Sequence, residues 1–368
     1  DRAGLGDWIA NMELLPNGIS GLADRIEELG MKFGLWIEPE MVNKDSDLYR
    51  KHPDWILQTP GRRVSHGRYQ YVLDFSRKEI VDYIYGMIAK LLSESNISYI
   101  KWDMNRSITE CYSIAYPADQ QGEIFHRYIL GVYDLYERLT SAFPEVLFES
   151  CASGGGRFDP GMLYYAPQGW VSDDSDAVER LKIQYGTSMC YPLSSMGSHV
   201  SVIPNHQVFR NTPLHTRANV AYFGTFGYEL DLNKLSDAEI AEVKAQIRFM
   251  KEYRELLQFG TFYRLKSPFN GNETVWMVVS EDKSKALVGY YRVLNGVNLP
   301  YSCVKLQGLD PDKLYENELA NTEHYGDELM NLGLITTDVS AGEVPQGAEP
   351  CTDFESRIYL LKEKQSTN

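Results

Sequence analysis

Segments typical of β-strands and of α-helices alternate along the first 258 residues, and this alternation restricts the fold more than any other feature of the chain. Residues 32–38 (KFGLWIE), 99–104 (YIKWDM) and 145–150 (EVLFES) have the apolar and aromatic composition of buried strands. Helical patterns separate them, for example over residues 76–95 and 122–142. Roughly six such strand–helix units predict a parallel α/β fold, in which helices cover both faces of the sheet.

Glycine and capping signals predict where several of these helices begin and end. Gly30 follows an amphipathic segment and predicts the C-terminal cap of a helix. Ser76 and Glu79 have the spacing of a capping box, and so do Ser236 and Glu239 before the last long helix of this region.

The pattern changes after about residue 260. Residues 274–282 (TVWMVVSED), 285–294 (KALVGYYRVL) and 356–363 (SRIYLLKE) are short β-type segments with turn residues and no helix between them. They predict a small antiparallel β-sandwich. We therefore expect two domains, a (β/α) barrel over residues 1–260 and an antiparallel β domain over residues 261–368.

The composition excludes several classes of protein. With 36 basic and 51 acidic residues the net charge is −15, which disfavours nucleic acid and anionic membranes as partners. The five cysteines lie far apart and form no CxxC pair, and the seven histidines form no HxH or HExxH pair. These patterns predict no metal and no other cofactor, and they favour a reducing, cytoplasmic location. No apolar run reaches the length of a membrane span.

Polar and aromatic residues collect where the predicted strands end. Within residues 99–106 (YIKWDMNR), strand alternation places one set of side chains, Lys101, Asp103 and Asn105, on the face opposite to Trp102 and Met104. Because the carboxyl ends of parallel strands converge, we expect the polar groups to share one pocket. The other strand ends contribute Trp36, Glu38, Glu40, Glu149, Cys151, Trp170, Asp173, Asp174 and Asp176.

Paired carboxylates among tryptophan, lysine, asparagine and arginine favour the cleavage of glycosidic bonds. Two acids can flank the scissile bond, aromatic faces can stack on sugar rings, and amides and cations can hold hydroxyl groups. No GxSxG motif indicates a serine nucleophile, and no GxGxxG or GxxxxGK motif follows a strand to bind a nucleotide.

Four segments in one order resemble motifs of the bacterial α-galactosidases of glycoside hydrolase family 36: YIKWDMNR, FESCASGGGRFD, WVSDDSDAVERLKIQYGTS and MGSHVSVIPNHQ. The resemblance runs from LGDW to the C-terminal β region, and it implies a (β/α)8 catalytic barrel between an N-terminal β-sandwich and a C-terminal β domain. It also implies retaining hydrolysis of terminal α-galactosides such as melibiose and raffinose, by a homotetramer. A family segment that precedes LGDW is absent, so we expect a chain that begins within a larger protein and lacks the first barrel strands.

The same resemblance implies roles for individual residues. Asp103 matches the nucleophile and Asp173 matches the general acid/base. The residues that match the lining of the galactose pocket are Trp36, Arg68, Lys101, Asn105, Cys151 and Gly154.

Electrostatics should favour opposite protonation states for the two acids. The Lys101 cation, on the same strand face, should lower the pKa of Asp103. Asp173 needs a raised pKa, to which the apolar bulk of Trp170 and the other acids of SDDSD should contribute.

Other residues of these motifs have structural interpretations. Asp176 is expected to cap the helix that begins near Ala177. The glycines after Cys151 (ASGGG) should leave room for a sugar to approach the backbone. For Glu38 and Glu40 we expect structural hydrogen bonds rather than catalysis.

Three alternatives stay open at this point. The same two acids could serve a galactosyl transferase of the raffinose-synthase type, in which a sugar hydroxyl replaces water. The chain could be a non-catalytic sugar-binding fragment whose carboxylates only hold hydroxyl groups. A cation-dependent phosphohydrolase on a barrel would need more histidines than the seven present.

Overall fold

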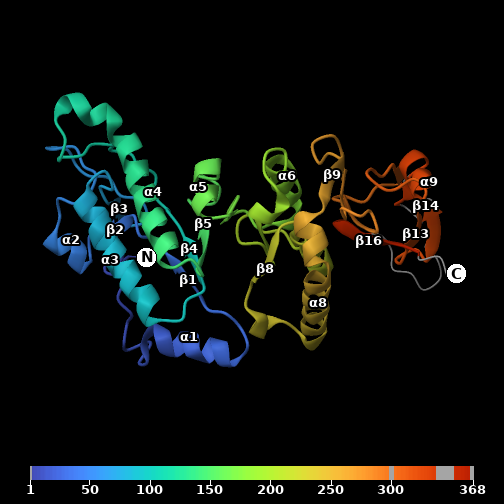
Figure 1. Ribbon diagram of the computed structural model, residues 1–368, viewed down its shortest axis with the longest axis horizontal. Helices are drawn as coiled ribbons and strands as arrows, with labels where there is room; N and C mark the ends of the chain where they lie inside the picture. Colours follow the sequence, from blue (N-terminus) through green and yellow to red (C-terminus); the bar gives the residue numbers. More distant parts are fainter. Residues whose placement is uncertain (1, 298–301, 337–351, 365–368) are drawn as a thin grey trace. The chain divides into compact units, whose positions relative to one another are not determined.

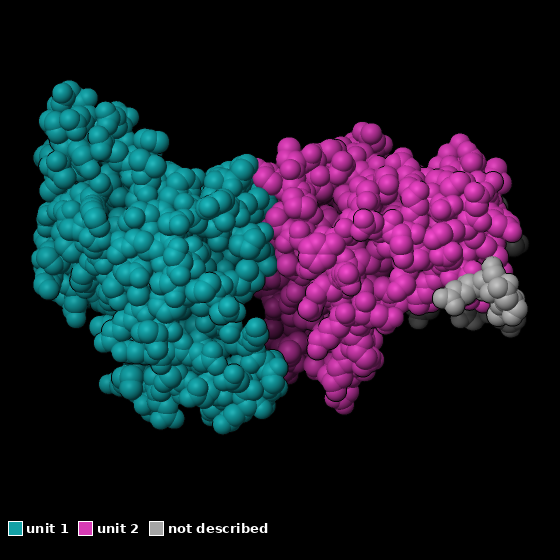
Figure 2. Space-filling model, in the orientation of Figure 1, with its two compact units in different colours: residues 1–173 teal, residues 174–368 magenta. Residues whose placement is uncertain are grey.

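The computed structural model describes residues 2–297, 302–336 and 352–364, and the chain divides into two compact units. Unit 1 comprises residues 1–173 and unit 2 comprises residues 174–368, which Figure 2 distinguishes by colour. This boundary falls inside the region expected to form the barrel, and the division at residue 260 stays a prediction.

A four-stranded parallel sheet in the order β1–β4–β5–β6 forms the framework of unit 1 (Figure 1). The strands span Gly34–Ile37 (β1), Tyr99–Trp102 (β4), Leu147–Ser150 (β5) and Gln168–Gly169 (β6). The helices of unit 1 are α1 (Gly18–Glu28), α2 (Asp47–Lys51), α3 (Lys78–Glu94), α4 (Ile124–Ala142) and α5 (Pro160–Tyr165), with the 3-10 helix η1 over Ala118–Glu123. Sequence analysis did not predict the short antiparallel pair of β2 (Met41–Asn43) and β3 (Gln70–Val72).

The strands of unit 1 are apolar because long amphipathic helices pack against the sheet. Ile100 of β4 belongs to one buried cluster with Ile84 of α3 and Leu135 of α4. Trp102 stacks on Tyr136 of α4, with the ring centroids 3.9 Å apart. Burial of these side chains drives the association of helix and sheet.

Unit 2 begins with two further parallel strands, β7 (Gly197–Ser201) and β8 (Thr225–Glu229), which pair with each other. Its helices in this part are α6 (Ala177–Thr187), α7 (Leu214–Ala221) and α8 (Asp237–Phe259), with the 3-10 helices η2 (Leu193–Ser195) and η3 (Leu232–Lys234).

An antiparallel sheet in the order β14–β13–β16–β11–β10–β9 completes unit 2. The strands span Thr261–Lys266 (β9), Glu273–Val279 (β10), Lys285–Arg292 (β11), Leu314–Asn317 (β13), Thr322–Tyr325 (β14) and Glu355–Glu363 (β16). A two-stranded sheet consists of β12 (Cys303–Val304) and β15 (Leu334–Ile335). The helix α9 (Gly326–Asn331) was not expected from the sequence.

Both faces of the antiparallel sheet are covered, which explains the continuous apolar composition of β10. Val275 belongs to a cluster with Leu329 of α9 and Leu334 of β15. The next residue, Trp276, faces the other way and packs on Phe223, with ring centroids 5.4 Å apart. Among the described residues, α9 and two short strands take the place of the second sheet that a sandwich would have.

Two of the three helix boundaries predicted from Gly30, Ser76 and Ser236 are confirmed. Gly30 has φ +75° and follows the end of α1, and Ser236 and Glu239 form the capping box of α8. The third is wrong. α3 begins without a side-chain cap, because the Ser76 hydroxyl donates a hydrogen bond to Asp74 instead.

The predicted α/β class is confirmed by parallel strands followed by an antiparallel sheet. Within the described ranges, the six parallel strands divide into four in unit 1 and two in unit 2, and their closure into a barrel stays a prediction. No helix in the described part of the chain combines the length and the apolar character that crossing a membrane requires.

Candidate active site

The carboxyl ends of the unit 1 strands bring predicted site residues to one edge of the sheet. A row of cross-strand partners runs over all four strands: Trp36, Lys101, Glu149 and Gln168. The residues that follow β4 and β5 are fixed by backbone hydrogen bonds of 2.8 Å, from Asp103 to the Ile37 carbonyl and from Cys151 to the Trp102 carbonyl. Partners in one row point to the same face, so these side chains can meet.

The predicted alternation along residues 101–105 is confirmed. Trp102 points to the helix face, where it is fully buried and donates a hydrogen bond to Glu40 at 2.9 Å. Lys101 and Asp103 contact groups on the opposite face. The end of β4 and the residue that follows it thus supply a core anchor and two polar site groups.

The Asp103 carboxylate accepts hydrogen bonds on both of its oxygens. Oδ2 accepts from Trp36 Nε1 at 3.1 Å and from Asn105 Nδ2 at 2.6 Å. Oδ1 accepts from the Met104 N–H at 2.8 Å and from the Ser153 N–H at 3.4 Å. Because Asp103 is only 7% exposed, these donors replace most of the water that would otherwise solvate its charge.

This donor set decides the charge of Asp103. Burial raises the pKa of Asp103, but hydrogen bonds from Asn105, the Cys151 thiol and Trp36 outweigh it and lower the pKa below its ordinary 3.8. Burial, together with the Asp103 charge, raises the pKa of Cys151, so this thiol stays neutral and acts as a donor. Asp103 is therefore ionised at neutral pH, as a nucleophilic carboxylate must be.

The pKa of Asp103 is lowered as the sequence predicted, but hydrogen bonds rather than the Lys101 charge are the leading causes. The Lys101 ammonium lies 3.2 Å from Glu149 Oε1 and 4.6 Å from the centroid of the Trp170 ring. Hydrogen-bond donors that touch the Asp103 carboxylate have the larger effect. Sequence analysis placed Glu149 at a strand end but assigned it no partner.

Glu38 and Glu40 fix the surroundings of Asp103, and structural hydrogen bonds were expected for both. Glu38 is fully buried and accepts from the Asn105 N–H and from Gln70 Nε2, each at 2.7 Å. Burial first, and the Asp103 charge in addition, raise the pKa of Glu38. The donors to Glu40 are Arg157, Trp102 and Tyr128.

The glycines of ASGGG make room for protein backbone. A Cβ atom added at Gly154 would lie 2.7 Å from the Asp173 backbone nitrogen. Ser153 and Gly154 have φ angles of +48° and +82°. Because the Ser153 N–H binds Asp103, this turn places the segments of the two predicted acids against one loop. A contact between Gly154 and a sugar stays a prediction.

Asp173 is the last residue of unit 1 and lies in a bend after β6. The residue is exposed, whereas sequence analysis expected the apolar bulk of Trp170 and the other acids of SDDSD around it. Trp170 is buried and faces the Lys101 ammonium. Exposure gives Asp173 access to water and to a leaving group.

Arg68 lies in the loop before β3 and is exposed. Arg68 and Tyr69 both have left-handed backbones, with φ +51° and +62°. Such conformations cost about 1–3 kcal/mol each outside glycine, so other contacts must hold the loop. Asn43 Nδ2 donates to the Tyr69 carbonyl at 2.9 Å, and the next residue, Gln70, binds Glu38.

In unit 2, Asp174 and Asp176 belong to the start of α6. Asp176 accepts from the Val178 and Glu179 N–H groups, each at 3.1 Å, and it pairs with Arg210. Asp174 Oδ1 accepts from the Asp176 N–H at 3.0 Å. The predicted helix cap is confirmed, and the Asp176 charge is paired with an arginine.

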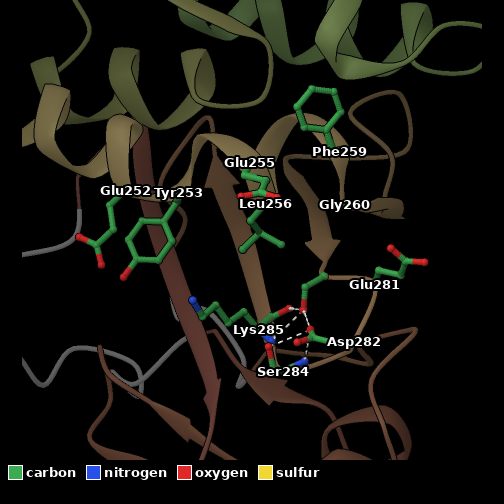
Figure 3. A pocket seen from close by; sticks show the side chains of 11 residues that line it. Glu252, Tyr253, Glu255, Leu256, Phe259, Gly260, Glu281, Asp282, Ser284 and Lys285 are labelled. Atoms are coloured by element: carbon green, nitrogen blue, oxygen red, sulfur yellow. Dashed lines mark hydrogen bonds between the residues drawn. The ribbon is translucent and has the colours of Figure 1, made fainter.

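Unit 2 also has a hollow of about 500 Å³ between the end of α8 and the β10–β11 hairpin (Figure 3). Its lining includes Asp282 and the exposed ring of Phe259. Asp282 accepts from Ser280 Oγ at 2.7 Å and from the Ser284 N–H at 2.9 Å, and these bonds lower its pKa to about 2. No predicted site residue lines this hollow, so the strand ends of unit 1 remain the candidate site.

The strand ends of unit 1 therefore offer an ionised carboxylate, an ammonium group and an indole that is 38% exposed. Such a set can bind sugar hydroxyl groups and supply a carboxylate nucleophile. Over the ranges that the structure describes, no group of three or more histidine, cysteine, aspartate or glutamate residues is arranged to hold a metal ion.

Two family models match the chain. The model described as Melibiase matches residues 1–260. The model described as Glycosyl hydrolase family 36 C-terminal domain matches residues 273–361.

Relatives and solved structures agree with these models. Alpha-galactosidase AgaA of Geobacillus stearothermophilus is 57% identical over 365 residues, which are 99% of this chain and 48% of that protein. Crystal structures of AgaA variants in complex with raffinose and with stachyose each have a TM-score of 0.94 and 53% identity, and each match covers 99% of this chain and 49% of that chain. This chain thus spans about half the length of the curated relatives that it matches.

Proposed function

Because this chain belongs to glycoside hydrolase family 36, we propose that the protein that carries it hydrolyses terminal α-galactosidic bonds with retention of configuration. Its substrates are melibiose and oligosaccharides of the raffinose type. The names of the relatives support the reaction, and the complexes of AgaA with raffinose and stachyose support the substrate class.

In the first step, Asp103 attacks the anomeric carbon of the galactosyl group. A bond forms between this carbon and a carboxylate oxygen of Asp103, while the bond to the leaving oxygen breaks. Asp173, protonated at the start, transfers its proton to that oxygen, and the other sugar leaves with a free hydroxyl group. The product on the protein is a β-galactosyl ester of Asp103.

In the second step, water replaces the departed sugar. Asp173, now a carboxylate, accepts a proton from this water as its oxygen bonds to the anomeric carbon, and the ester bond to Asp103 breaks. Two inversions return galactose in the α configuration. Asp173 ends protonated and Asp103 ends ionised, ready for the next substrate.

The observation on which this proposal rests is the set of donors around Asp103. Four hydrogen bonds from Trp36, Asn105 and two backbone N–H groups keep a buried carboxylate ionised. The loop that supplies one of these donors also packs on the backbone of Asp173. The aspartates replaced in the two AgaA variants are as far apart in that sequence as Asp103 and Asp173 are in this one.

The remaining predicted residues bind the galactosyl group in this proposal. Lys101 and Asn105 donate to its hydroxyl groups, Trp36 offers its exposed indole face, and Arg68 lies in the loop before β3. Cys151 and Gly154 complete the wall. For the whole protein we extend the proposal to a closed (β/α)8 barrel, a homotetramer and a cytoplasmic location, as the family resemblance implies.

Replacement of Asp103 by alanine tests the nucleophile directly. Asp103→Ala should lose hydrolysis of α-galactosides by several orders of magnitude. Sodium azide should restore turnover of an activated aryl α-galactoside and give β-galactosyl azide, because azide enters from the face that Asp103 has vacated. Recovery of the α-anomer would contradict Asp103 as the nucleophile.

Product analysis tests hydrolysis against transfer. With melibiose and excess sucrose, free galactose should form faster than any trisaccharide. A trisaccharide that forms faster than galactose would replace hydrolysis by the transferase alternative.

A further inference from the structure

Glu149 is a buried acid at the candidate site to which the proposed mechanism gives no role. Its side chain is 3% exposed and lies in the middle of the sheet on β5. Oε1 lies 3.2 Å from Lys101 Nζ. Oε2 accepts hydrogen bonds from the Tyr99 hydroxyl and, at 3.1 Å, from Gln168 Nε2.

Strand register explains why these groups meet. Lys101, Glu149 and Gln168 are direct cross-strand partners on β4, β5 and β6. Tyr99 precedes Lys101 by two positions on β4, so its side chain points to the same face. Groups on both neighbouring strands therefore hold the Glu149 carboxylate, and its position is set by the sheet rather than by a loop.

The Glu149 charge in turn determines where the Lys101 ammonium can lie. A buried carboxylate strongly attracts a cation at this distance, because little water screens the pair. The Trp170 ring covers a second side of the ammonium, 4.6 Å from the ring centroid. Lys101 is still 26% exposed, and an ammonium group has three donor hydrogens, so it can also donate to a ligand.

We propose that Glu149 is a positioning residue that acts through Lys101 to orient the galactosyl group. The Glu149 carboxylate draws the long lysine side chain back onto the sheet and holds the ammonium beside the Trp170 ring. In this position the ammonium meets a sugar hydroxyl. The carboxylate also keeps this cation away from Asp103, which follows the end of β4 two positions after Lys101. This inference rests on the proposed function, since it assigns the sugar contact to Lys101.

A double-mutant cycle tests whether Glu149 acts through Lys101. The measurements are kcat and KM for melibiose in the whole protein that carries this chain. Glu149→Gln and Lys101→Met should each raise KM about tenfold, the loss expected for one hydrogen bond from a charged group, with kcat changed less than about threefold. The double variant should be no worse than Lys101→Met alone, because both changes remove the same contact.

Glu149→Asp keeps the charge but moves it back toward the strand, so KM should rise by about threefold and folding should be preserved. The matched control is Glu79→Gln. Glu79 pairs with Arg77 near the start of α3, so its substitution should leave kcat and KM unchanged. If the two single effects on KM multiply in the double variant, or if Glu149→Gln and Glu149→Asp lower only the melting temperature, the inference is overturned.

Calorimetry of galactose binding separates this inference from the proposed function. If the wild-type protein binds galactose but hydrolyses no α-galactoside, the proposed function fails, and the inference then depends on the binding constant. About tenfold weaker galactose binding by Glu149→Gln would support it, and equal binding would overturn it. A wild-type protein that neither binds galactose nor hydrolyses α-galactosides overturns both.

Discussion

Asp103 in unit 1 and Asp176 in unit 2 are both buried aspartates, 7% and 1% exposed, but their surroundings move their pKa values in opposite directions. The pKa of Asp103 is lowered by hydrogen bonds that outweigh burial. The pKa of Asp176 is raised because burial, with the Asp174 charge in addition, outweighs the helix N–H groups and the Arg210 charge. A neighbouring arginine is thus a poorer guide to an ionised aspartate than the full set of donors.

The two carboxylates also differ in how their hydrogen-bond donors are distributed over the two oxygens. Asp103 accepts two hydrogen bonds on each oxygen. Asp176 accepts on Oδ2 alone, from Val178, Glu179 and Arg210. Among the described residues its buried Oδ1 has no hydrogen-bond partner. An oxygen without a donor lowers the gain from ionisation, since charge on a carboxylate is shared by both oxygens.

The origin of the donors also differs between the two units. Two of the Asp103 donors, Trp36 and the Ser153 N–H, come from β1 and from the loop after β5, so they require the assembled sheet. Two donors of Asp176 lie two and three residues further along the chain, as in any helix cap. Asp103 thus depends on donors from two other strand ends, whereas two of the three donors of Asp176 are local to its helix.

Conversion of each aspartate to asparagine should separate a site from a cap by activity. Asp103→Asn should lower kcat for melibiose by about three to four orders of magnitude, because an amide cannot form the ester. Asp176→Asn should leave kcat per folded molecule within about threefold of wild type. Initial rates and near-ultraviolet circular dichroism measure the activity and the folded fraction. Equal loss of kcat in the two variants would contradict the contrast.

The structural role of Asp176 should appear in the stability of the protein when the whole side chain of Asp176 is removed. Asp176→Ala removes the cap of α6 and the partner of Arg210, and it should cost about 2 kcal/mol. A clear fall in the melting temperature is expected by differential scanning calorimetry, with normal kcat at temperatures where the protein stays folded. An unchanged melting temperature would show that the cap contributes little to unit 2.

Patterns within single segments predicted much of this arrangement. Alternation in YIKWDMNR placed Lys101 and Asp103 opposite Trp102, and local spacing predicted the caps at Asp176 and Ser236. These features depend on a few neighbouring residues and on the periods of strand and helix. For that reason they were accessible from the sequence.

Contacts between distant segments were not predictable in the same way. The pairing of Lys101 with Glu149 depends on the register between β4 and β5. The donor from Ser153 depends on a left-handed backbone that nothing in its residue type requires. Gly154 proved to accommodate the backbone of Asp173, which only the assembled chain reveals. The sequence signal for this contact was an acid at the end of a neighbouring predicted strand. It pointed to Glu149 as a candidate but not to its contact with Lys101.

Loss of a single donor should move Asp103 partway toward the condition of Asp176. Trp36→Phe keeps an aromatic ring but removes the indole N–H that donates to Oδ2 at 3.1 Å. One lost hydrogen bond among several should lower kcat about threefold to tenfold with little change in stability. The matched control is Trp102→Phe, which removes the donor to Glu40 and should lower the melting temperature at unchanged kcat. Steady-state kinetics that give both variants the same kcat would refute a special role for the Asp103 donors.

The pH dependence of stability should show the smallest difference. Because the folded-state pKa of Asp176 is raised above 3.8, the folded protein binds this proton more strongly than the unfolded chain does. The contribution of Asp176 is therefore greatest below pH 3.8 and falls as the pH rises through the folded pKa. Asparagine does not titrate, so the melting temperature of Asp176→Asn relative to wild type should rise between pH 4 and pH 7.

Asp282→Asn is a better control for this titration than Asp103→Asn. The charge of Asp103 also raises the pKa of Glu38, so its removal would add a second slope. The lowered pKa of Asp282, about 2, makes its contribution complete above its unfolded value of 3.8, and it is lost only as the pH falls toward 2. The melting temperature of Asp282→Asn relative to wild type should therefore stay constant between pH 4 and pH 7. Parallel slopes for Asp176→Asn and Asp282→Asn in calorimetry would contradict the raised pKa of Asp176.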